Sequence, residues 1–336
     1  MMNFRGNALV TGGAGFIGSN YVLRTVAERP EARVTVVDSL SYAANRASLD
    51  PVADAISFVE GSTADAELTD SLVKDADVVV NFAAESHNDN SLNDPTPFLQ
   101  SNVIGTWNLL EAVRRHGARL HHISTDEVFG DLAADDPARF TEETRYRPSS
   151  PYSATKASAD HLVRAWARSF GIQATISNCS NNYGPRQHVE KFIPRQITNI
   201  LDGEKPKLYG SGTNVRDWIH VDDHNSAVQT IIDRGVIGET YLIGAECEVG
   251  NLAIVQTLLR IMGKPEDWFD FVSDRPGHDV RYAIDPSKLT GDLDWSPHYQ
   301  DLEAGLEATV AWYSDHRDWW EAAKRPTEQK YAVIGR

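Results

Sequence analysis

Short β-branched runs alternate with helix-like segments through the first half of the chain. The apolar runs lie at 8–11, 34–37, 56–59, 78–81, 120–124 and 174–178. Segments with helical spacing of apolar residues separate them, at 17–27, 67–73, 97–116 and 153–170. This order of strand, helix and strand is typical of a parallel sheet with helices on both faces. The pattern therefore predicts an α/β fold with a doubly wound parallel sheet.

After about residue 180 this rhythm breaks into shorter pieces. They comprise helix-like segments at 192–201, 225–233, 251–262 and 302–316 and a strand-like run at 217–221. We predict a first domain at 1–180, to whose sheet about 217–245 also contributes because the run 241–243 is short and apolar. Residues 181–330 are expected to form mostly a smaller C-terminal lobe. The tail from Arg325 onward is charged and is expected to be loosely ordered.

The balance of charged residues argues against two classes of binding partner. Acidic residues outnumber basic ones by 48 to 32, which argues against nucleic acid and anionic membranes, because both favour clustered Lys and Arg. An anionic small ligand needs only a local basic lining, which the later chain offers in Lys191, Arg195, Lys207, Arg216, Arg275 and Arg281. No apolar run approaches the ~18 residues of a membrane span, and the N-terminus shows no signal-peptide pattern. We therefore expect a cytoplasmic location and no membrane partner.

The two cysteines show no pattern of their own. Cys179 and Cys247 form no CxxC pair and have no paired Cys/His spacing. Neither a disulfide framework nor a zinc or other metal site is therefore expected.

A glycine-rich turn follows the first predicted strand. Residues 8–18 read ALVTGGAGFIG, so Gly12, Gly15 and Gly18 stand between a strand and a helix. Glycine permits the tight turn and close approach to a pyrophosphate, whose charge the helix N-terminus attracts. Asp38 ends the second strand, twenty residues after Gly18, and is placed to accept hydrogen bonds from a ribose. No basic residue follows it directly, so a Rossmann-type domain that binds NAD rather than NADP is predicted.

A tyrosine and a lysine lie one helical turn apart. Tyr152 and Lys156 form YxxxK in PYSATKASAD, which places both side chains on one helix face. The lysine can lower the pKa of the phenol and hold the nicotinamide ribose. A phenolate could then accept a hydroxyl proton while hydride leaves for the nicotinamide. Ser124 and Thr125 follow the preceding strand and strengthen this interpretation.

Two adjacent acids, Asp126 and Glu127, follow the strand at 120–124 in the stretch STDEVFG. The carboxyl ends of parallel strands are where open sheets bind ligands. Like charges placed side by side and partly dehydrated raise one pKa, so one acid can stay protonated near neutral pH. The residues themselves do not say which acid that is. Adjacent acids after a strand can also cap a helix or pair with basic residues.

These motifs resemble the extended short-chain dehydrogenase/reductase family. The resemblance rests on TGGAGFIG, Asp38, NFAAES, SNVIGT, HISTDEVFG, YSATK and NNYGP, in family order. More narrowly, the chain resembles the dTDP-glucose 4,6-dehydratases, which begin deoxysugar synthesis, often for rhamnose. That likeness covers nearly the whole chain, through AAESH, STDEVFGDL, SPYSATKASAD, NNYGPRQHVEKFIP, LYGSGTNVRDWIHVDDH and DRPGHDVRYAID. Epimerases of the family typically carry small uncharged residues in place of Thr125, Asp126 and Glu127.

The resemblance implies a reaction in three stages on one bound nucleotide sugar. Hydride moves from C4 of glucose to NAD while Tyr152 takes the hydroxyl proton and Thr125 orients that hydroxyl. Water is then lost across C5 and C6, with Glu127 as the base at C5 and Asp126 as the acid at the leaving hydroxyl. Hydride finally returns to C6, which gives a 4-dehydro-6-deoxy sugar. Lys156 completes the catalytic set.

The resemblance also implies two sets of binding residues. For the cofactor they are Gly12, Gly15, Phe16, Ile17, Gly18, Asp38, Ser39, Ser41, Ser62, Thr63, Ala83, Ala84, Ser86, Ser101, Tyr152, Lys156 and Asn182. For the nucleotide-sugar substrate they are His87, Thr125, Asn181, Lys191, Lys207, Tyr209, Arg216, Asn251 and His278. Arg216 could instead pair with Asp217 or Asp222 as a structural bridge.

Four positions depart from the family pattern. Ser62 replaces a usual Asp, Asn88 a usual small apolar residue, Phe129 a common Tyr and Arg186 a common aromatic residue. None removes a catalytic group, but cofactor affinity and the shape of the pocket are left open. Members of the family are commonly homodimers through paired helices, here 97–116 and 153–170.

Two other functions are compatible with part of this pattern. A sugar-nucleotide 4-epimerase or decarboxylase keeps the fold and cofactor but has no use for Asp126 and Glu127. A non-catalytic NAD-dependent sensor would tolerate the loss of Tyr152 or Lys156, and both are present.

Overall fold

A seven-stranded parallel sheet forms the centre of the larger lobe. The computed structural model describes residues 6–273 and 279–333. The strand order is β10-β6-β5-β4-β1-β2-β3, and all neighbouring strands run parallel. The strands are β1 (Asn7–Thr11), β2 (Arg33–Asp38), β3 (Ile56–Glu60), β4 (Val78–Asn81), β5 (Arg119–Thr125), β6 (Ala174–Cys179) and β10 (Thr240–Ile243). The predicted doubly wound α/β fold is confirmed, and the order reverses between β1 and β4, where such sheets bind ligands.

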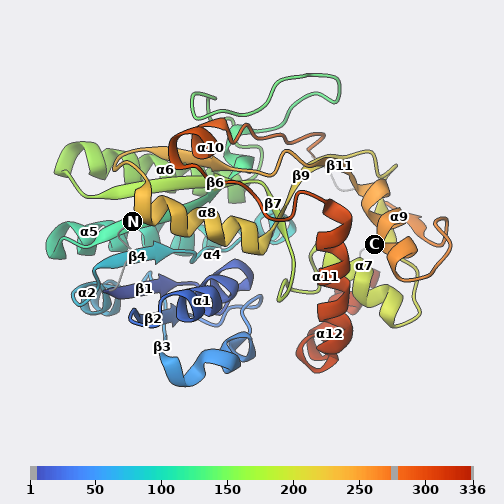
Figure 1. The fold of residues 1–336 in the computed structure, drawn as a ribbon, viewed down its shortest axis with the longest axis horizontal. Coiled ribbons are helices and arrows are strands. Elements are labelled where there is room, and N and C mark those ends of the chain that lie inside the picture. Colours follow the sequence, from blue (N-terminus) through green and yellow to red (C-terminus); the bar gives the residue numbers. More distant parts are fainter. Residues whose placement is uncertain (1–5, 274–278, 334–336) are drawn as a thin grey trace.

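Helices cover both faces of this sheet (Figure 1). One face packs against α1 (Phe16–Glu28), α8 (Val221–Arg234) and α10 (Ser287–Leu293). The other face packs against α2 (Ala66–Val73), α5 (Thr106–His116) and α6 (Pro151–Phe170). Burial on both faces explains why the strands read as continuous apolar runs rather than as alternating patterns. β4 is buried at all four positions, whereas the edge strand β3 has no buried residue.

The helix predicted at 97–116 contains a change of helical type. It begins as α4 (Thr96–Phe98), continues as the π-helical segment η2 (Leu99–Gly105) and ends as α5. The buried Asn102 of η2 accepts a hydrogen bond from the amide of Glu85 at 2.9 Å and donates one to Thr155 of α6 at 2.9 Å. Segments of π-helix often accompany functional sites. Here the segment ties α6 to the loop after β4.

The second lobe is mainly helical and lies at the right of Figure 1. Its core is formed by α7 (Phe192–Leu201), α9 (Asn251–Ile261), α11 (Leu302–Asp315) and α12 (Arg317–Val333). Two small sheets accompany it, one of β7 (Asn181–Tyr183), β9 (Val215–His220) and β11 (Glu248–Gly250), the other of β8 (Lys207–Tyr209) and β12 (Asp270–Val272). Short elements complete the chain: η1 (Arg46–Ala55), α3 (Asn88–Asn93) and η3 (Asp126–Phe129).

The prediction of a loosely ordered tail from Arg325 is wrong for the described residues. That segment belongs to α12, which runs to Val333. Tyr331 of this helix is buried, Glu328 pairs with Arg195 of α7 at 3.0 Å, and Lys330 pairs with Glu190 at 3.9 Å. The charged residues that suggested disorder are thus used in tertiary ion pairs, which a composition rule does not detect.

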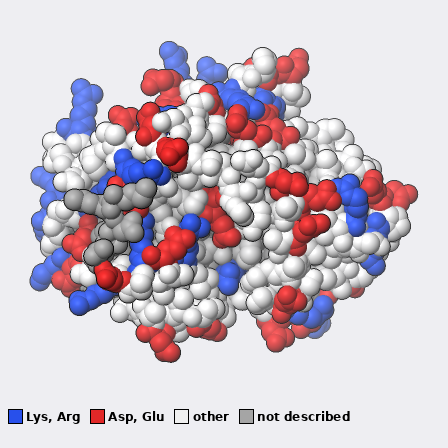
Figure 2. Space-filling view, in the orientation of Figure 1, with Lys and Arg blue, Asp and Glu red and all other residues white. Residues whose placement is uncertain are grey.

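Charges are mixed on the visible surface. On the face shown in Figure 2, Lys and Arg side chains are interspersed with Asp and Glu. Among residues 6–273 and 279–333, no helix combines the length and apolar character needed to cross a membrane.

Candidate active site

The glycine turn between β1 and α1 brings the backbone close to the end of β4. Gly12 has a φ of +67°, and a Cβ there would lie 2.6 Å from the amide nitrogen of Ala83. A Cβ on Gly18 would lie 2.3 Å from the carbonyl oxygen of Gly12. Gly15 is the N-cap of α1 and offers no side-chain hydrogen bond to the helix. The first amides of α1 are therefore available to an anion.

Asp38 lies at the end of β2, beside this turn. Its carboxylate accepts hydrogen bonds from the amides of Ala14 at 2.9 Å and Leu40 at 2.8 Å. Burial raises the pKa of Asp38, while these backbone donors act in the opposite direction. The carboxylate is thus held against the glycine turn, at the position expected for a ribose partner.

A cavity of about 300 Å³ opens at the carboxyl ends of the central strands. It lies at the point where the strand order reverses, between β1 and β4. Every residue that the sequence assigns to cofactor binding lines it, from Gly12 at one end to Asn182 at the other. The five predicted catalytic residues, Thr125, Asp126, Glu127, Tyr152 and Lys156, line it too.

A second cavity of about 190 Å³ adjoins the first, since Glu127, Asn181 and Lys191 line both. The residues predicted for substrate that line the second cavity are His87, Asn181, Lys191, Lys207, Tyr209, Arg216 and Asn251. Thr125 lines the first cavity instead. His278 lies outside the described residues.

The two acids occupy a single turn of 3-10 helix after β5. Thr125 caps this turn, and its hydroxyl accepts a hydrogen bond from the amide of Glu127 at 3.3 Å. Successive residues of a 3-10 helix point about 120° apart. Asp126 is therefore 2% exposed, whereas Glu127 is half-buried and reaches both cavities.

The environment of Asp126 favours its protonated form. Burial, and after it the charge of Glu127, raises the pKa of Asp126 well above its ordinary value. Asp126 is therefore the better candidate of the pair for the proton donor, an assignment that the sequence could not make. Its Oδ1 accepts a hydrogen bond from Thr125 at 3.3 Å.

Tyr152 and Lys156 lie next to the acids on α6. Lys156 donates to the carbonyl of Ile123 at 2.6 Å, and burial lowers its pKa. Burial and the charge of Glu127 raise the pKa of Tyr152 well above its ordinary value, and the Thr125 hydroxyl opposes them. The expected lowering of the phenol pKa by Lys156 is thus outweighed by burial within the described residues.

A buried carboxylate behind the site was missed by sequence reasoning. Asp160, one turn after Lys156, accepts hydrogen bonds from Ser124, Tyr146 and Asn178 at 2.8, 2.8 and 3.2 Å. The same Asn178 amide donates to the carbonyl of Thr125 at 3.1 Å. The network fixes the end of β5 against α6. A signal could have been the i+4 spacing from Lys156, which places Asp160 on the same helix face.

Four buried polar atoms of residues that line the first cavity have no hydrogen-bond partner within the described residues. They are Asp126 Oδ2, Ser180 Oγ, Asn181 Oδ1 and Asn182 Oδ1. Buried polar atoms are normally hydrogen-bonded. These atoms therefore fit a polar ligand, and together with the glycine turn they fit a dinucleotide.

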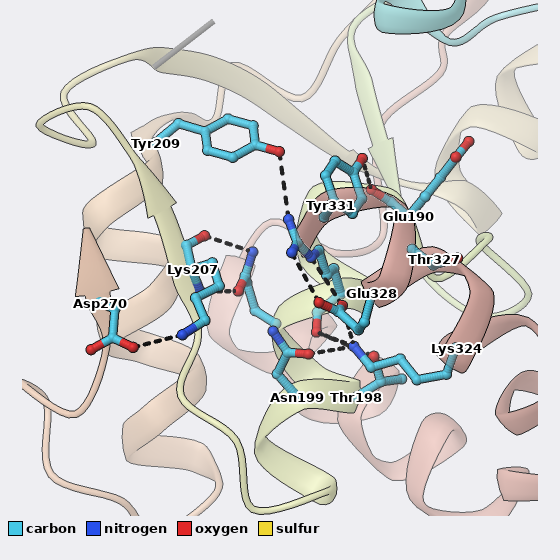
Figure 3. A network of polar contacts seen from close by, with 12 residues as sticks. Glu190, Thr198, Asn199, Lys207, Tyr209, Asp270, Lys324, Thr327, Glu328 and Tyr331 are labelled. Carbon is cyan, nitrogen blue, oxygen red and sulfur yellow. Dashed lines mark hydrogen bonds and ion pairs between the residues drawn. The ribbon is translucent and has the colours of Figure 1, made fainter. Parts of the chain in front are cut away.

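The wall of the second cavity includes Arg195, which the sequence offers as part of a basic lining, and Tyr331, which the sequence does not assign. Arg195 of α7 donates two hydrogen bonds to Glu328 of α12, both at 3.0 Å, and its guanidinium lies 3.8 Å from the ring centroid of Tyr331. A third Arg195 N–H donates to Tyr209 at 3.5 Å. Figure 3 shows the side chains of Glu328 and Tyr331 within this network of polar contacts, and Tyr331 lines the second cavity. No local sequence signal connects these segments.

The basic residues of the second cavity differ in their partners. Arg216 donates to the backbone carbonyls of Val215 at 2.8 Å and Asp279 at 2.9 Å, and no ion pair joins it to Asp217 or Asp222 among the described residues. Lys207 pairs with Asp270 at 2.6 Å. Arg216 is therefore held by backbone dipoles, and no acid of the described residues forms an ion pair with it.

The four departures from the family pattern fall in different places. Ser62 lines the first cavity and accepts a hydrogen bond from Ala64 at 3.1 Å. Asn88 contacts Glu127. Phe129 is buried and stacks on Phe140, and Arg186 bonds to Asn20 at 3.1 Å without lining either cavity.

Comparison with known proteins gives consistent matches. The family model described as GDP-mannose 4,6 dehydratase matches residues 9–309. The dTDP-glucose 4,6-dehydratase of Mycobacterium tuberculosis is 64% identical over 327 residues, which cover 97% of this chain and 99% of the relative. The dTDP-glucose 4,6-dehydratase DesIV of Streptomyces venezuelae, solved with NAD and TYD bound, has 42% identity and a TM-score of 0.91, and the match covers 95% of this chain and 100% of that one. A UDP-glucose 4-epimerase of Thermotoga maritima, solved with UDP-glucose, has 28% identity and a TM-score of 0.85 over 92% of this chain and 99% of that one.

Proposed function

The chain belongs to the dTDP-glucose 4,6-dehydratase family, and from this membership we propose that it converts dTDP-glucose to dTDP-4-dehydro-6-deoxy-glucose. The observation that carries the proposal is the pair of acids in the first cavity. Asp126 is buried and its pKa is raised, while Glu127 is half-buried and lines both cavities. Elimination of water across two adjacent carbons requires one proton donor and one base close together, and this pair supplies both.

NAD is the proposed cofactor, held at its pyrophosphate by the glycine turn and the first amides of α1, and at its adenosine ribose by Asp38. When bound, it supplies an acceptor for the hydride of C4 and returns that hydride to C6. The cavity at the reversal of strand order supports this assignment, as does the NAD described for the Streptomyces and Bacillus anthracis relatives.

The chain's own residues would move the protons. Tyr152, next to Thr125, would take the proton of the C4 hydroxyl in its phenolate form. The resulting ketone acidifies C5, and Glu127 removes the C5 proton. Asp126 gives its proton to the C6 oxygen, which leaves as water, and Glu127 returns a proton to C5 when hydride reaches C6. Lys156, held by the carbonyl of Ile123, would keep a positive charge near the ribose and the phenol.

The second cavity is proposed to hold the nucleotide diphosphate. Arg216 supports this role because its guanidinium faces backbone carbonyls rather than a carboxylate, so its charge remains for phosphate oxygens. Lys191 reaches the carbonyl of Ser86 at 3.2 Å and lines both cavities, where it can bridge sugar and phosphate.

We also propose an oligomeric state and a cellular location. The chain is proposed to form a homodimer through its outer helices, because Leu99, Ile104 and Trp107 of η2 and α5 are 52%, 36% and 43% exposed. Analytical ultracentrifugation tests this. A cytoplasmic location is supported by Cys179 and Cys247, which are both free thiols.

The decisive experiment follows one hydrogen atom. Incubation with dTDP-glucose carrying deuterium at C4 should yield a 4-keto product with deuterium in the C6 methyl group. An epimerised sugar that keeps its C6 hydroxyl would instead favour the epimerase. Release of carbon dioxide from a substrate with a carboxylate at C6 would favour the decarboxylase. Recovery of unchanged substrate would favour a sensor. The identity of 64% to a dehydratase and 28% to an epimerase supports the first outcome.

A further inference from the structure

Asn88 lies between Glu127 and Ser150, the N-cap of the helix that carries Tyr152. It is the first residue of α3, is half-buried and lines the second cavity. Its side-chain amide donates a hydrogen bond from Nδ2 to Oε2 of Glu127 at 2.7 Å. Its Oδ1 accepts a hydrogen bond from the hydroxyl of Ser150 at 2.8 Å.

The chemistry of the partners fixes the orientation of this amide. An ionised carboxylate accepts hydrogen bonds and donates none, so it requires the NH₂ end of Asn88. The oxygen end is left for a donor, which the Ser150 hydroxyl provides. A flipped amide would place two oxygens against each other. The contact with Glu127 is thus a charge-assisted bond that favours the ionised form of that acid.

Ser150 connects this contact to the helix that carries the tyrosine. It is the N-cap of α6 and forms a capping box with Ser153, whose amide donates to the Ser150 hydroxyl at 3.1 Å and whose own hydroxyl accepts from the Ser150 amide at 3.0 Å. Tyr152 follows two residues later. A continuous chain of hydrogen bonds therefore runs from Glu127 through Asn88 to the helix end that positions Tyr152.

Glu127 and Tyr152, which this series of hydrogen bonds connects, must act on neighbouring atoms of one substrate. In the proposed reaction Tyr152 works at the C4 oxygen and Glu127 at C5, so their separation has to match a single sugar ring. Displacement of a base by about 1 Å can cost on the order of a hundredfold in rate. Glu127 sits on a turn after β5 and Tyr152 on α6, and the Asn88 side chain bridges these elements directly.

We propose that Asn88 is a positioning residue that holds Glu127 ionised and in register with Tyr152, by joining it to the N-cap of α6. The inference rests on the proposed dehydratase function and extends it to a residue outside the catalytic set. Its effect is expected on removal of the C5 proton and much less on oxidation at C4.

The test compares Asn88→Leu and Asn88→Asp with the wild type. Leucine has a similar volume and removes both hydrogen bonds, whereas aspartate keeps the shape and places a carboxylate against Glu127. Exchange of the C5 proton with D₂O is expected to slow by about ten- to a hundredfold in Asn88→Leu and by more in Asn88→Asp. Transient NADH absorbance should rise at nearly the wild-type rate and decay more slowly. Asn93→Ala, an exposed asparagine at the other end of α3, is the control and should behave as wild type.

The outcomes separate this inference from the proposed function. If the wild type makes no deuterated methyl product, the proposed function fails before any variant is measured. If the wild type is active and both Asn88 variants exchange C5 at the wild-type rate, the inference is overturned. A purely structural role would instead lower C4 oxidation, C5 exchange and melting temperature together, and would also overturn it. Should Asn88→Leu fold poorly, the isosteric Asn88→Asp still decides between these results.

Discussion

Replacement of Asp126 by asparagine should slow catalysis and stabilise the fold at the same time. The side chain is 2% exposed, and its pKa is raised well above the ordinary value by burial and by Glu127. Asparagine has the same shape and no charge, so it reproduces the protonated acid that the folded chain prefers. It lacks only the proton that must be given to the leaving hydroxyl.

The magnitude of the stability change follows from linkage. In the unfolded chain Asp126 ionises above its ordinary pKa of 3.8, whereas in the folded chain its pKa is raised well above that value. Stability from this group is therefore fully present below pH 3.8 and is lost as pH rises. The loss amounts to about 1.4 kcal/mol per pH unit for as long as the folded acid stays protonated. Asp126→Asn escapes this loss, so its advantage over the wild type should grow as pH rises above 3.8 and level off only where the folded acid ionises.

Two assays test this reasoning on the same protein. Denaturant unfolding across the pH range gives the difference in free energy of unfolding, with the exposed Asp135→Asn as a control whose difference from wild type should stay level. Single-turnover kinetics should show C4 oxidation within a few-fold of wild type, seen as NADH absorbance, and water loss slowed by about 10²- to 10⁴-fold. A pH-independent stability difference, or water loss within tenfold of wild type, would refute the role of Asp126 as a buried protonated acid.

Other predictions follow from neighbouring contacts. Tyr152→Phe should abolish transient NADH, with a loss of about 10²- to 10⁴-fold, while dTDP binding measured by calorimetry stays unchanged; a normal transient would exclude the tyrosine as base. Glu328→Gln should lower unfolding free energy by about 3 kcal/mol, since it removes the carboxylate paired with Arg195, which is 3% exposed. As a control, Glu321→Gln at an exposed position of the same helix should change the free energy of unfolding by less than about 0.5 kcal/mol. Equal effects of the two substitutions would contradict the role of the Glu328–Arg195 pair. Burial raises the pKa of Asp217 to about 6, so its stabilising contribution is lost between pH 3.8 and about 6. The advantage of Asp217→Asn should rise over that range and then level off, and a continued rise would show a higher pKa.

Local patterns were sufficient to predict the central sheet. β4 was predicted with its observed ends, and β1, β2, β3, β5 and β6 to within one residue at each end. These strands are buried on both faces, so their apolar runs are uninterrupted and easy to recognise. The glycine turn was equally clear, because Gly12 and Gly18 occupy positions where a Cβ would clash with backbone.

Two features that depend on contacts between distant parts of the chain were not predicted. The π-helical segment η2 has an ordinary helical pattern, and its bonding depends on Asn102 reaching Glu85 and Thr155. The end of α12 looked disordered because it is charged, yet its Glu328 pairs with Arg195, 133 residues away. Sequence reasoning found residues with recognisable motifs and missed those whose role arises from such pairing.

The amino-acid sequence by itself determined the order of strands and helices, the glycine turn and the types of chemical group that enter the site. The tertiary structure decided which of two adjacent acids is the better candidate for the proton donor, which amide holds the other, and which distant helix closes the second cavity. The reason is that backbone conformation depends mainly on neighbours along the chain. Protonation and hydrogen bonding depend instead on burial and on groups that folding brings from elsewhere.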